Sequence, residues 1–211
     1  MKIQILTDNT KSWFIPFGHI LKKKIEDQNH EVSYIFDKSD LIHGDICFLL
    51  SCSRIIEHNY LKLNTHNIVV HASDLPQGKG FAPLQWQILA GVNEITLTLF
   101  EVVEKVDAGP YYLKEVIKFN GTELYNELRE KLAQKIIDMC LNFVDNRNKL
   151  NPIFQTGNES YYQKRTVKDD QIDPLKSIAE QFDHFRIADN DNYPLWFIHR
   201  GRKYFLKIYG E

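Results

Sequence analysis

Apolar runs alternate with amphipathic segments along residues 1–150. The runs at 45–50 and 67–71 are continuous, which is typical of strands buried on both faces of a parallel sheet. The same pattern predicts strands at 2–7, 31–36, 94–103 and 111–119, and helices after Pro16, after Pro83 and after a cap at Thr122. This alternation predicts an α/β fold, with helices on both faces of a mostly parallel, doubly wound sheet.

A polar segment punctuated by proline and glycine, 146–158, separates this region from the rest of the chain. We take residues 1–150 as the main domain and residues 151–211 as a small α+β appendage. In the appendage, Asp173-Pro174 predicts a helix start and 196–208 predicts a hairpin. The expected apolar face of that helix consists of Leu175, Ile178, Phe182 and Phe185.

Composition and charge exclude several classes of protein. The chain has 211 residues, 43% of them hydrophobic, and 26 basic and 28 acidic residues give a net charge of -2. This balance argues against a broad nucleic-acid contact, which usually needs a basic face. The amino terminus is unlike a signal peptide, and no stretch approaches the ~20 apolar residues of a membrane span, so we expect a cytoplasmic protein. Cys47, Cys52 and Cys140 form no CxxC pair and are expected to be buried, reduced thiols.

Candidate chemistry concentrates directly after the strand at 67–71, in the segment His71-Ala-Ser-Asp-Leu-Pro-Gln-Gly-Lys-Gly80. Parallel sheets bind ligands beyond the carboxyl ends of their strands, and a histidine there can exchange protons near neutral pH. The alternative is a strand-end histidine whose ring nitrogen caps a turn. For Asp107, near the end of the strand at 94–103, the alternative is an ordinary Asp-x-Gly turn.

Taken together, the two motifs resemble a known family. The segment from His71 to Gly80, followed by Asp107-Ala-Gly109, is similar to the HxSLLPxxxG and D-x-G signature of the formyltransferases. The similarity covers about 45–112, and the order of elements extends it to about residue 145. The resemblance implies a Rossmann-like catalytic domain, N10-formyltetrahydrofolate as formyl donor, and no metal.

The resemblance also implies roles for individual residues. His71 would act as general base or oxyanion partner, and Asp107 would orient it and relay protons. The family has an asparagine two positions before the histidine, where this chain has Val69. Asn67 is on the same strand face but, at about 3.3 Å per residue, lies roughly 13 Å from His71. Ser73, Ser51 or a backbone amide is therefore expected to contact the oxyanion, unless a water serves instead.

Further site residues follow from the same resemblance. The loop that begins at Ser51 resembles the border of the folate pocket, and the expected cofactor-binding residues are Ser53, Arg54, Val103, Glu104, Lys105 and Val106. The expected substrate-binding residues are Gly78, Lys79, Gly80, Lys164 and Arg165. The last two could meet a pyrophosphate through charge-assisted hydrogen bonds, or be surface charge on a linker. Arg54 is equally open to interpretation as a solvated surface cation.

The expected acceptor is a nucleotide-linked amino sugar, such as a 4-amino-4,6-dideoxy sugar. The segment 161–177 and the ending from Tyr193 to Tyr204 resemble sugar-nucleotide N-formyltransferases, and the appendage is not basic enough to suggest tRNA. Glycinamide-ribonucleotide-type and methionyl-tRNA-type formyltransferases are the alternatives. A catalytically inactive folate- or nucleotide-binding module is a third, motivated by Val69. A homodimer is left open.

Overall fold

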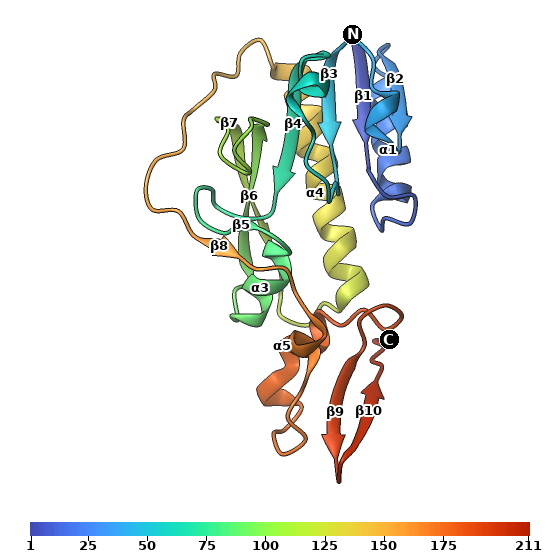
Figure 1. Ribbon diagram of the computed structural model, residues 1–211, viewed down its shortest axis with the longest axis vertical. Coiled ribbons are helices and arrows are strands. Elements are labelled where there is room, and N and C mark those ends of the chain that lie inside the picture. The colour runs from blue at the N-terminus through green and yellow to red at the C-terminus, as the bar shows by residue number, and fades with distance from the viewer.

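A six-stranded sheet forms the centre of the computed structural model, which describes residues 1–211 (Figure 1). In the order β2-β1-β3-β4-β6-β7, its strands are β2 (Glu31–Ile35), β1 (Lys2–Leu6), β3 (Gly44–Leu49), β4 (Asn64–His71), β6 (Glu94–Glu101) and β7 (Tyr111–Lys118). The strands from β2 to β4 pair in parallel, whereas β6 runs antiparallel to both β4 and β7. The predicted fold class, with a mostly parallel sheet, is confirmed.

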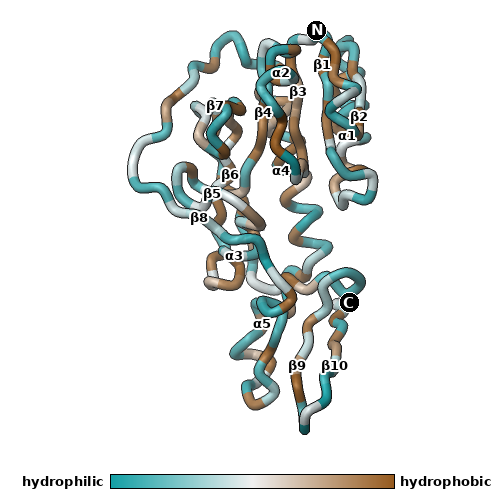
Figure 2. The backbone as a smooth tube through the Cα atoms, in the orientation of Figure 1, coloured by the Kyte–Doolittle hydropathy of each residue, from teal (hydrophilic) through white to brown (hydrophobic).

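The two faces of the sheet are covered differently. α1 (Ile15–Glu26) and α4 (Tyr125–Asn146) pack on one face, which holds a core cluster of 28 buried residues. The other face carries a smaller cluster beneath the short helix α2 (His58–Leu61) and the 3-10 turn η1 (Lys38–Asp40). Figure 2 shows β1 and β3 largely in the apolar colour, as expected for central strands buried on both faces.

The carboxyl ends of the parallel strands lie at one edge of the sheet, and Figure 1 shows them pointing toward the appendage. Two short elements follow β4 at this edge: β5 (Lys79–Gly80) and α3 (Pro83–Leu89). After α4 the chain returns along the edge strand β7, where Ile153 pairs with Tyr111. It then forms β8 (Tyr161–Tyr162), which pairs with β5. The segment after residue 150 thus helps to fix the loop that carries the histidine motif.

Most predicted elements are confirmed, but two helix starts are wrong. Thr122 does not cap α4, because its N–H and hydroxyl both donate to Oδ1 of Asn120, at 2.8 and 2.7 Å. The helix begins at Tyr125, and the carboxylate of Glu127 accepts the N–H of Leu124 at 2.8 Å. The cap is therefore a glutamate that reaches back from inside the first turn.

The helix expected at Asp173 is absent from the structure. The side chain of Gln181 accepts the N–H of Asp173 and donates to its carbonyl, both at 3.0 Å. These bonds hold 173–177 as a loop, and Leu175 is 94% exposed instead of packed. Helical structure starts later, at η3 (Ala179–Gln181) and α5 (Phe182–Arg186), and the 3-10 turn η2 (Val167–Asp170) precedes the loop.

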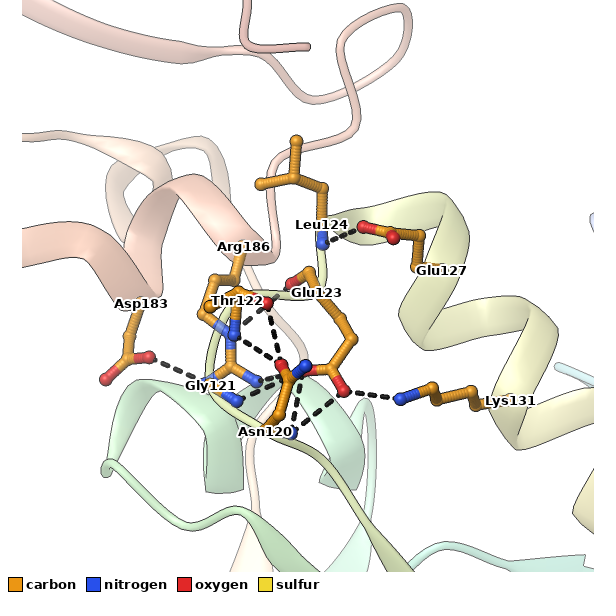
Figure 3. A network of polar contacts seen from close by, with 9 residues as sticks. All are labelled: Asn120, Gly121, Thr122, Glu123, Leu124, Glu127, Lys131, Asp183 and Arg186. Atoms are coloured by element: carbon orange, nitrogen blue, oxygen red, sulfur yellow. Dashed lines mark hydrogen bonds and ion pairs between the residues drawn. The ribbon is translucent and has the colours of Figure 1, made fainter. Parts of the chain in front are cut away.

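The predicted hairpin is confirmed as β9 (Leu195–His199) paired with β10 (Arg202–Leu206). It shares a small core with α5, formed by Ile172, Phe185, Ala188 and Leu195. Arg186, which has no exposed surface, joins this part to the start of α4 (Figure 3). Its guanidinium donates to the carbonyl of Glu123 at 3.3 Å and lies 3.4 Å from the Glu123 carboxylate. The helices of the structure are too short or too polar to span a bilayer.

Candidate active site

A cavity of about 620 Å³ opens at the carboxyl end of β4. Its first wall consists of Trp13, Phe14, Leu84, Arg129, Leu132 and Ile136, on the α1–α4 side of the sheet. Its second wall includes the loop 51–56 and the segment 102–107, on the α2 side. Because side chains alternate along a strand, Val70 faces the first wall, whereas Val69 and His71 face the second. His71 and Asp107 both line this cavity.

The ring of His71 is held by the loop that follows it. His71 is 8% exposed, and its Nε2 lies 2.8 Å from the carbonyl oxygen of Gly78. A carbonyl only accepts hydrogen bonds, so Nε2 carries a hydrogen and, in the neutral ring, Nδ1 is the nitrogen that can accept a proton. Both interpretations of His71 from the sequence therefore apply. Its ring bonds the turn that follows the strand, and it also faces the cavity.

Asp107 acts on the same loop from the opposite side. Its Oδ2 accepts the N–H of Gly80 at 2.8 Å, and its backbone has a positive φ of 50°. The structure shows no hydrogen bond or ion pair between His71 and Asp107. The direct orientation of the histidine by the aspartate is therefore not seen: Asp107 fixes Gly80, and Gly78 in the same loop fixes His71.

Glycine is required at both ends of this arrangement. A Cβ on Gly80, whose φ is +94°, would lie 2.5 Å from the carbonyl oxygen of Tyr162 in β8. A Cβ on Gly109 would lie 1.6 Å from the carbonyl oxygen of Glu101 in β6. The two glycines of the motifs therefore permit close backbone approach between segments that are distant in sequence.

Val69 lines the cavity at the position where the family has asparagine. The register of β4 against β6 runs without interruption from Ile68 to His71, so no bulge brings Asn67 forward. Asn67 is 6% exposed, and its side-chain amide donates to the carbonyl of Leu61 at 2.8 Å. It stabilises the packing of α2 and is not available to a ligand. Gln85 at α3 is the only carboxamide side chain that lines the cavity.

The loop 51–54 is fixed by an acid from the end of β1. The carboxylate of Asp8 accepts the N–H groups of Ser53 and Arg54, both at 2.7 Å. Ser51 has a positive φ of 58°, and its hydroxyl is bonded to Ser12 at 2.8 Å. All three predicted loop residues line the cavity, and the exposed Arg54 stands at its rim.

The segment after β6 supplies most of the remaining second wall. Val103, Glu104 and Val106 line the cavity and are exposed, as expected for a surface that contacts a ligand through its backbone and apolar groups. Lys105 does not line it. Its ammonium lies 3.0 Å from the Glu159 carboxylate, so its side chain is directed to the segment before β8.

Several predicted polar contacts with substrate do not find support in the geometry. Lys79 is 1% exposed and its ammonium lies 2.8 Å from Glu159, and Arg165 is paired with Asp170. Lys164 is exposed but lies outside the cavity lining. Ser73 is 2% exposed, does not line the cavity, and its hydroxyl has no hydrogen-bond partner. These side chains serve the packing of the motif loop and of the appendage.

All three cysteines are free thiols. Cys47 and Cys140 are buried, whereas Cys52 is partly buried and lines the cavity. Its Sγ donates to the carbonyl of Leu6 at 3.3 Å, and burial raises its pKa to about 12. A thiol with so high a pKa is a poor nucleophile, so Cys52 serves as a packing residue of the second wall. No group of three or more acidic, histidine or cysteine side chains is placed to hold a metal.

Comparisons with known proteins agree on one family. The family model described as formyl transferase matches residues 7–141. Methionyl-tRNA formyltransferase of Mycoplasma capricolum is 32% identical over 149 residues, which is 68% of this chain and 46% of that relative. The chain spans about half the length of the curated relatives it matches.

Solved structures share the fold over the whole chain. A 4-N formyltransferase from Francisella tularensis has a TM-score of 0.77 at 20% identity, covering 100% of this chain and 98% of that one. HypX from Aquifex aeolicus, in complex with tetrahydrofolic acid, has a TM-score of 0.83 at 18% identity and covers 99% of this chain and 37% of that one. At these identities the likeness concerns the arrangement of elements.

Proposed function

Because the chain belongs to the formyl transferase family, we propose that it is an N-formyltransferase that takes formyl groups from N10-formyltetrahydrofolate. The observation that supports the transfer is the position of His71 and Asp107 in one cavity, within the matched residues 7–141. The acceptor we propose is the primary amine of a nucleotide-linked amino sugar. This chain covers 46% of the length of that curated relative. The activity and the acceptor are therefore inferred from this chain's own residues and are not transferred from the relative.

The protein's own groups divide the chemistry between them. Nδ1 of His71 would accept the proton that the attacking amine loses, because Nε2 is held by Gly78. Asp107 keeps the Gly78–Gly80 loop in place through Gly80 and adds a negative charge to the cavity. In place of the family asparagine, the carboxamide of Gln85 or a backbone N–H would stabilise the oxyanion.

The size and the lining of the whole cavity fit a folate. The cavity volume of about 620 Å³ lies within the range of about 300–1,000 Å³ that small-molecule sites occupy. Of the 28 residues that line it, 18 are hydrophobic, which suits a flat aromatic ring system. Ser53, Arg54 and the backbone from Val103 to Val106 would hold the donor there, and the bound donor would supply an activated formyl carbonyl.

Charge favours a small acceptor over tRNA. A tRNA substrate calls for a basic surface that neutralises several phosphates, whereas this chain has a net charge of -2. Methionyl-tRNA formylation is the second candidate, and it is favoured by the names of the relatives most similar in sequence. A binding module without activity is the third, motivated by Val69.

One panel of assays separates these functions. Purified protein is incubated with N10-formyltetrahydrofolate and one acceptor at a time, and tetrahydrofolate production is followed. The acceptors are UDP- and dTDP-linked 4-amino-4,6-dideoxy sugars, methionyl-tRNA and glycinamide ribonucleotide. We expect turnover with a sugar nucleotide and none above background with the other two. Turnover with methionyl-tRNA alone would replace the proposed acceptor, and folate binding without turnover in any arm would support the binding module.

A further inference from the structure

Arg129 is a cation in the cavity that lacks a hydrogen bond. It lies in the second turn of α4, is 24% exposed in its side chain, and lines the first wall. Its guanidinium, with five N–H donors, makes no hydrogen bond to any other residue of the protein. None of its nitrogen atoms is buried without a partner, so its N–H groups are accessible in the cavity and available to an acceptor in a bound ligand.

Two aromatic rings hold this guanidinium in position. Its carbon lies 3.9 Å from the ring centroid of Tyr125, one turn earlier on α4, and 5.2 Å from that of Trp13. Stacking on aromatic faces orients a guanidinium without using its N–H donors. The side chain is therefore fixed in direction while its donors stay available.

The nearest acid does not satisfy these donors. The carboxylate of Asp189 lies 3.8 Å from Arg129, which is beyond hydrogen-bond distance. Its Oδ1 accepts the N–H groups of Asp191 and Asn192, and its Oδ2 accepts the Asn192 amide, all at 3.1 Å. Asp189 thus offsets part of the charge of Arg129 and leaves its hydrogen-bonding capacity unused.

The position of Arg129 on the first wall indicates which of the two ligands it would contact. The proposed folate contacts that line the cavity all lie on the second wall: Ser53, Arg54, Val103, Glu104 and Val106. Arg129 lies on the first wall with Trp13, Leu132 and Ile136. A donor on the second wall leaves the first wall, on the other side of β4, for the acceptor.

We propose that Arg129 is the anion-binding residue of the acceptor half of the cavity, and that the acceptor carries a phosphate or carboxylate group. The assignment of this anion to the acceptor rests on the proposed function. The presence of an anion site does not depend on it. A planar guanidinium binds either group through two parallel hydrogen bonds, so the two sources share one chemistry.

The test measures binding without turnover. The wild type, Arg129→Gln and Arg54→Gln are titrated with UDP, inorganic pyrophosphate, glutarate and tetrahydrofolate by calorimetry. Arg54 is the matched control, because it lines the same cavity from the second wall. We expect Arg129→Gln to weaken UDP and pyrophosphate binding by about 10- to 100-fold, and tetrahydrofolate binding by less than about twofold. Arg54→Gln should leave UDP binding within about twofold.

The other outcomes are also decisive. Glutarate that binds and is lost in Arg129→Gln, with no binding of UDP or pyrophosphate, would keep the site and make the acceptor a carboxylate. Unchanged anion binding in Arg129→Gln, or a loss confined to tetrahydrofolate, overturns the proposal. Arg129→Lys keeps the positive charge, so it should recover part of the UDP affinity. That recovery would show that residue 129 can be replaced without unfolding the protein. UDP binding through Arg129 in a protein without formyl transfer would leave this site standing and remove only the proposed reaction.

Discussion

At the scale of single residues, His71 is defined by one hydrogen bond. The Gly78 carbonyl fixes Nε2 as the protonated nitrogen, so His71 can act as a base only through Nδ1. The identity of the residue was predictable from the sequence, because it lies within a motif. The tautomer was not, because it depends on the path of the loop after Leu75.

Replacing His71 should remove turnover and spare binding. We expect His71→Ala to lower kcat by at least about a hundredfold, which is the range of general acid–base catalysis. Tetrahydrofolate affinity should change little, because the proposed folate contacts lie on other segments. His66→Gln is the control, since His66 is on the same strand but outside the cavity, paired with Glu101 at 3.0 Å. A folded His71→Ala enzyme with wild-type kcat would exclude His71 from the reaction.

For Ser73 we expect the opposite of His71, because replacing it should raise stability and leave turnover unchanged. Its hydroxyl is buried and has no partner, so it is a cost to the folded state. Ser73→Ala should raise the free energy of unfolding by about 1 kcal/mol in urea titrations, and kcat should stay within about twofold. A loss of kcat by tenfold or more would return Ser73 to the reaction as an oxyanion donor.

Long charged side chains were the least predictable residues. Lys79 and Lys105 both pair with Glu159, and Arg165 pairs with Asp170. Glu159 lies some eighty positions after Lys79, and no local sequence pattern indicates that contact. Arg129 was not predicted as a site residue. The apolar stripe of α4 indicates a helix that packs on the sheet, and it gives no information about the polar residues beside the stripe. The one available signal was the aromatic residue four positions earlier, Tyr125.

At the scale of elements, two close backbone approaches shape the site. β6 and β7 are joined at Glu101, whose N–H donates to the carbonyl of Pro110 at 2.9 Å. Gly109 lies against the carbonyl of the same residue. The sequence predicted both strands and the turn between them, and it predicted that Gly109 matters. The contact with Glu101 is the physical reason.

Gly109→Ala should therefore disturb the second wall. Its Cβ would lie 1.6 Å from a backbone oxygen that cannot rotate away, so the end of β6 must shift. We expect a loss of roughly 3 kcal/mol in the free energy of unfolding, and weaker tetrahydrofolate binding. Gly91→Ala is the comparison: its φ is +77° and nothing lies within 4 Å, so backbone strain should cost about 1 kcal/mol. Equal losses in the two variants would contradict the clash.

Elements with strong periodicity or continuous apolar runs were predicted to within a few residues. β4 is longer than predicted because its first residues are polar yet paired: the Asn64 side chain accepts a hydrogen bond from Gln4 at 2.8 Å, and His66 contacts Glu101. The helix at Asp173 failed because a side chain from residue 181 satisfies the backbone that a helix would have used. In both cases a distant polar partner overrides the local pattern.

At the scale of the whole molecule, the division at residue 150 stays a prediction, and the structure shows what joins the two parts. The chain after α4 adds β8 to β5, which forms the end of the histidine motif. Its later part is joined to α4 by Arg186 and Glu123, which are 0% and 3% exposed in their side chains. Asp189, which flanks Arg129, belongs to the same later part. The appendage is thus coupled to the cavity from two sides.

Glu123 is the acidic residue in the contact between Arg186 and the segment before α4. Burial alone would raise its pKa, but hydrogen bonds from Lys131 and from the backbone N–H of Asn120 outweigh burial, and the pKa falls from 4.5 to about 2 (Figure 3). The folded state therefore favours the charged form more than the unfolded state does. The stabilisation is complete above pH 4.5 and is lost as the pH falls toward 2.

This sign gives a prediction for acid stability. At one unit of pKa per 1.4 kcal/mol, the Glu123 charge contributes roughly 3 kcal/mol at neutral pH. Glu123→Gln removes that charge and leaves the buried Arg186 paired with Asp183 alone, so the variant should be less stable at pH 7 by about the same amount. The difference between the two unfolding free energies, measured by urea titration, should shrink as the pH is lowered and nearly vanish at about pH 2. Glu57→Gln, in an exposed pair with Lys38, should leave the curve nearly unchanged. A gap between wild type and Glu123→Gln that stays constant with pH would mean that the carboxylate charge does not stabilise the fold, and that only the shape of the side chain matters.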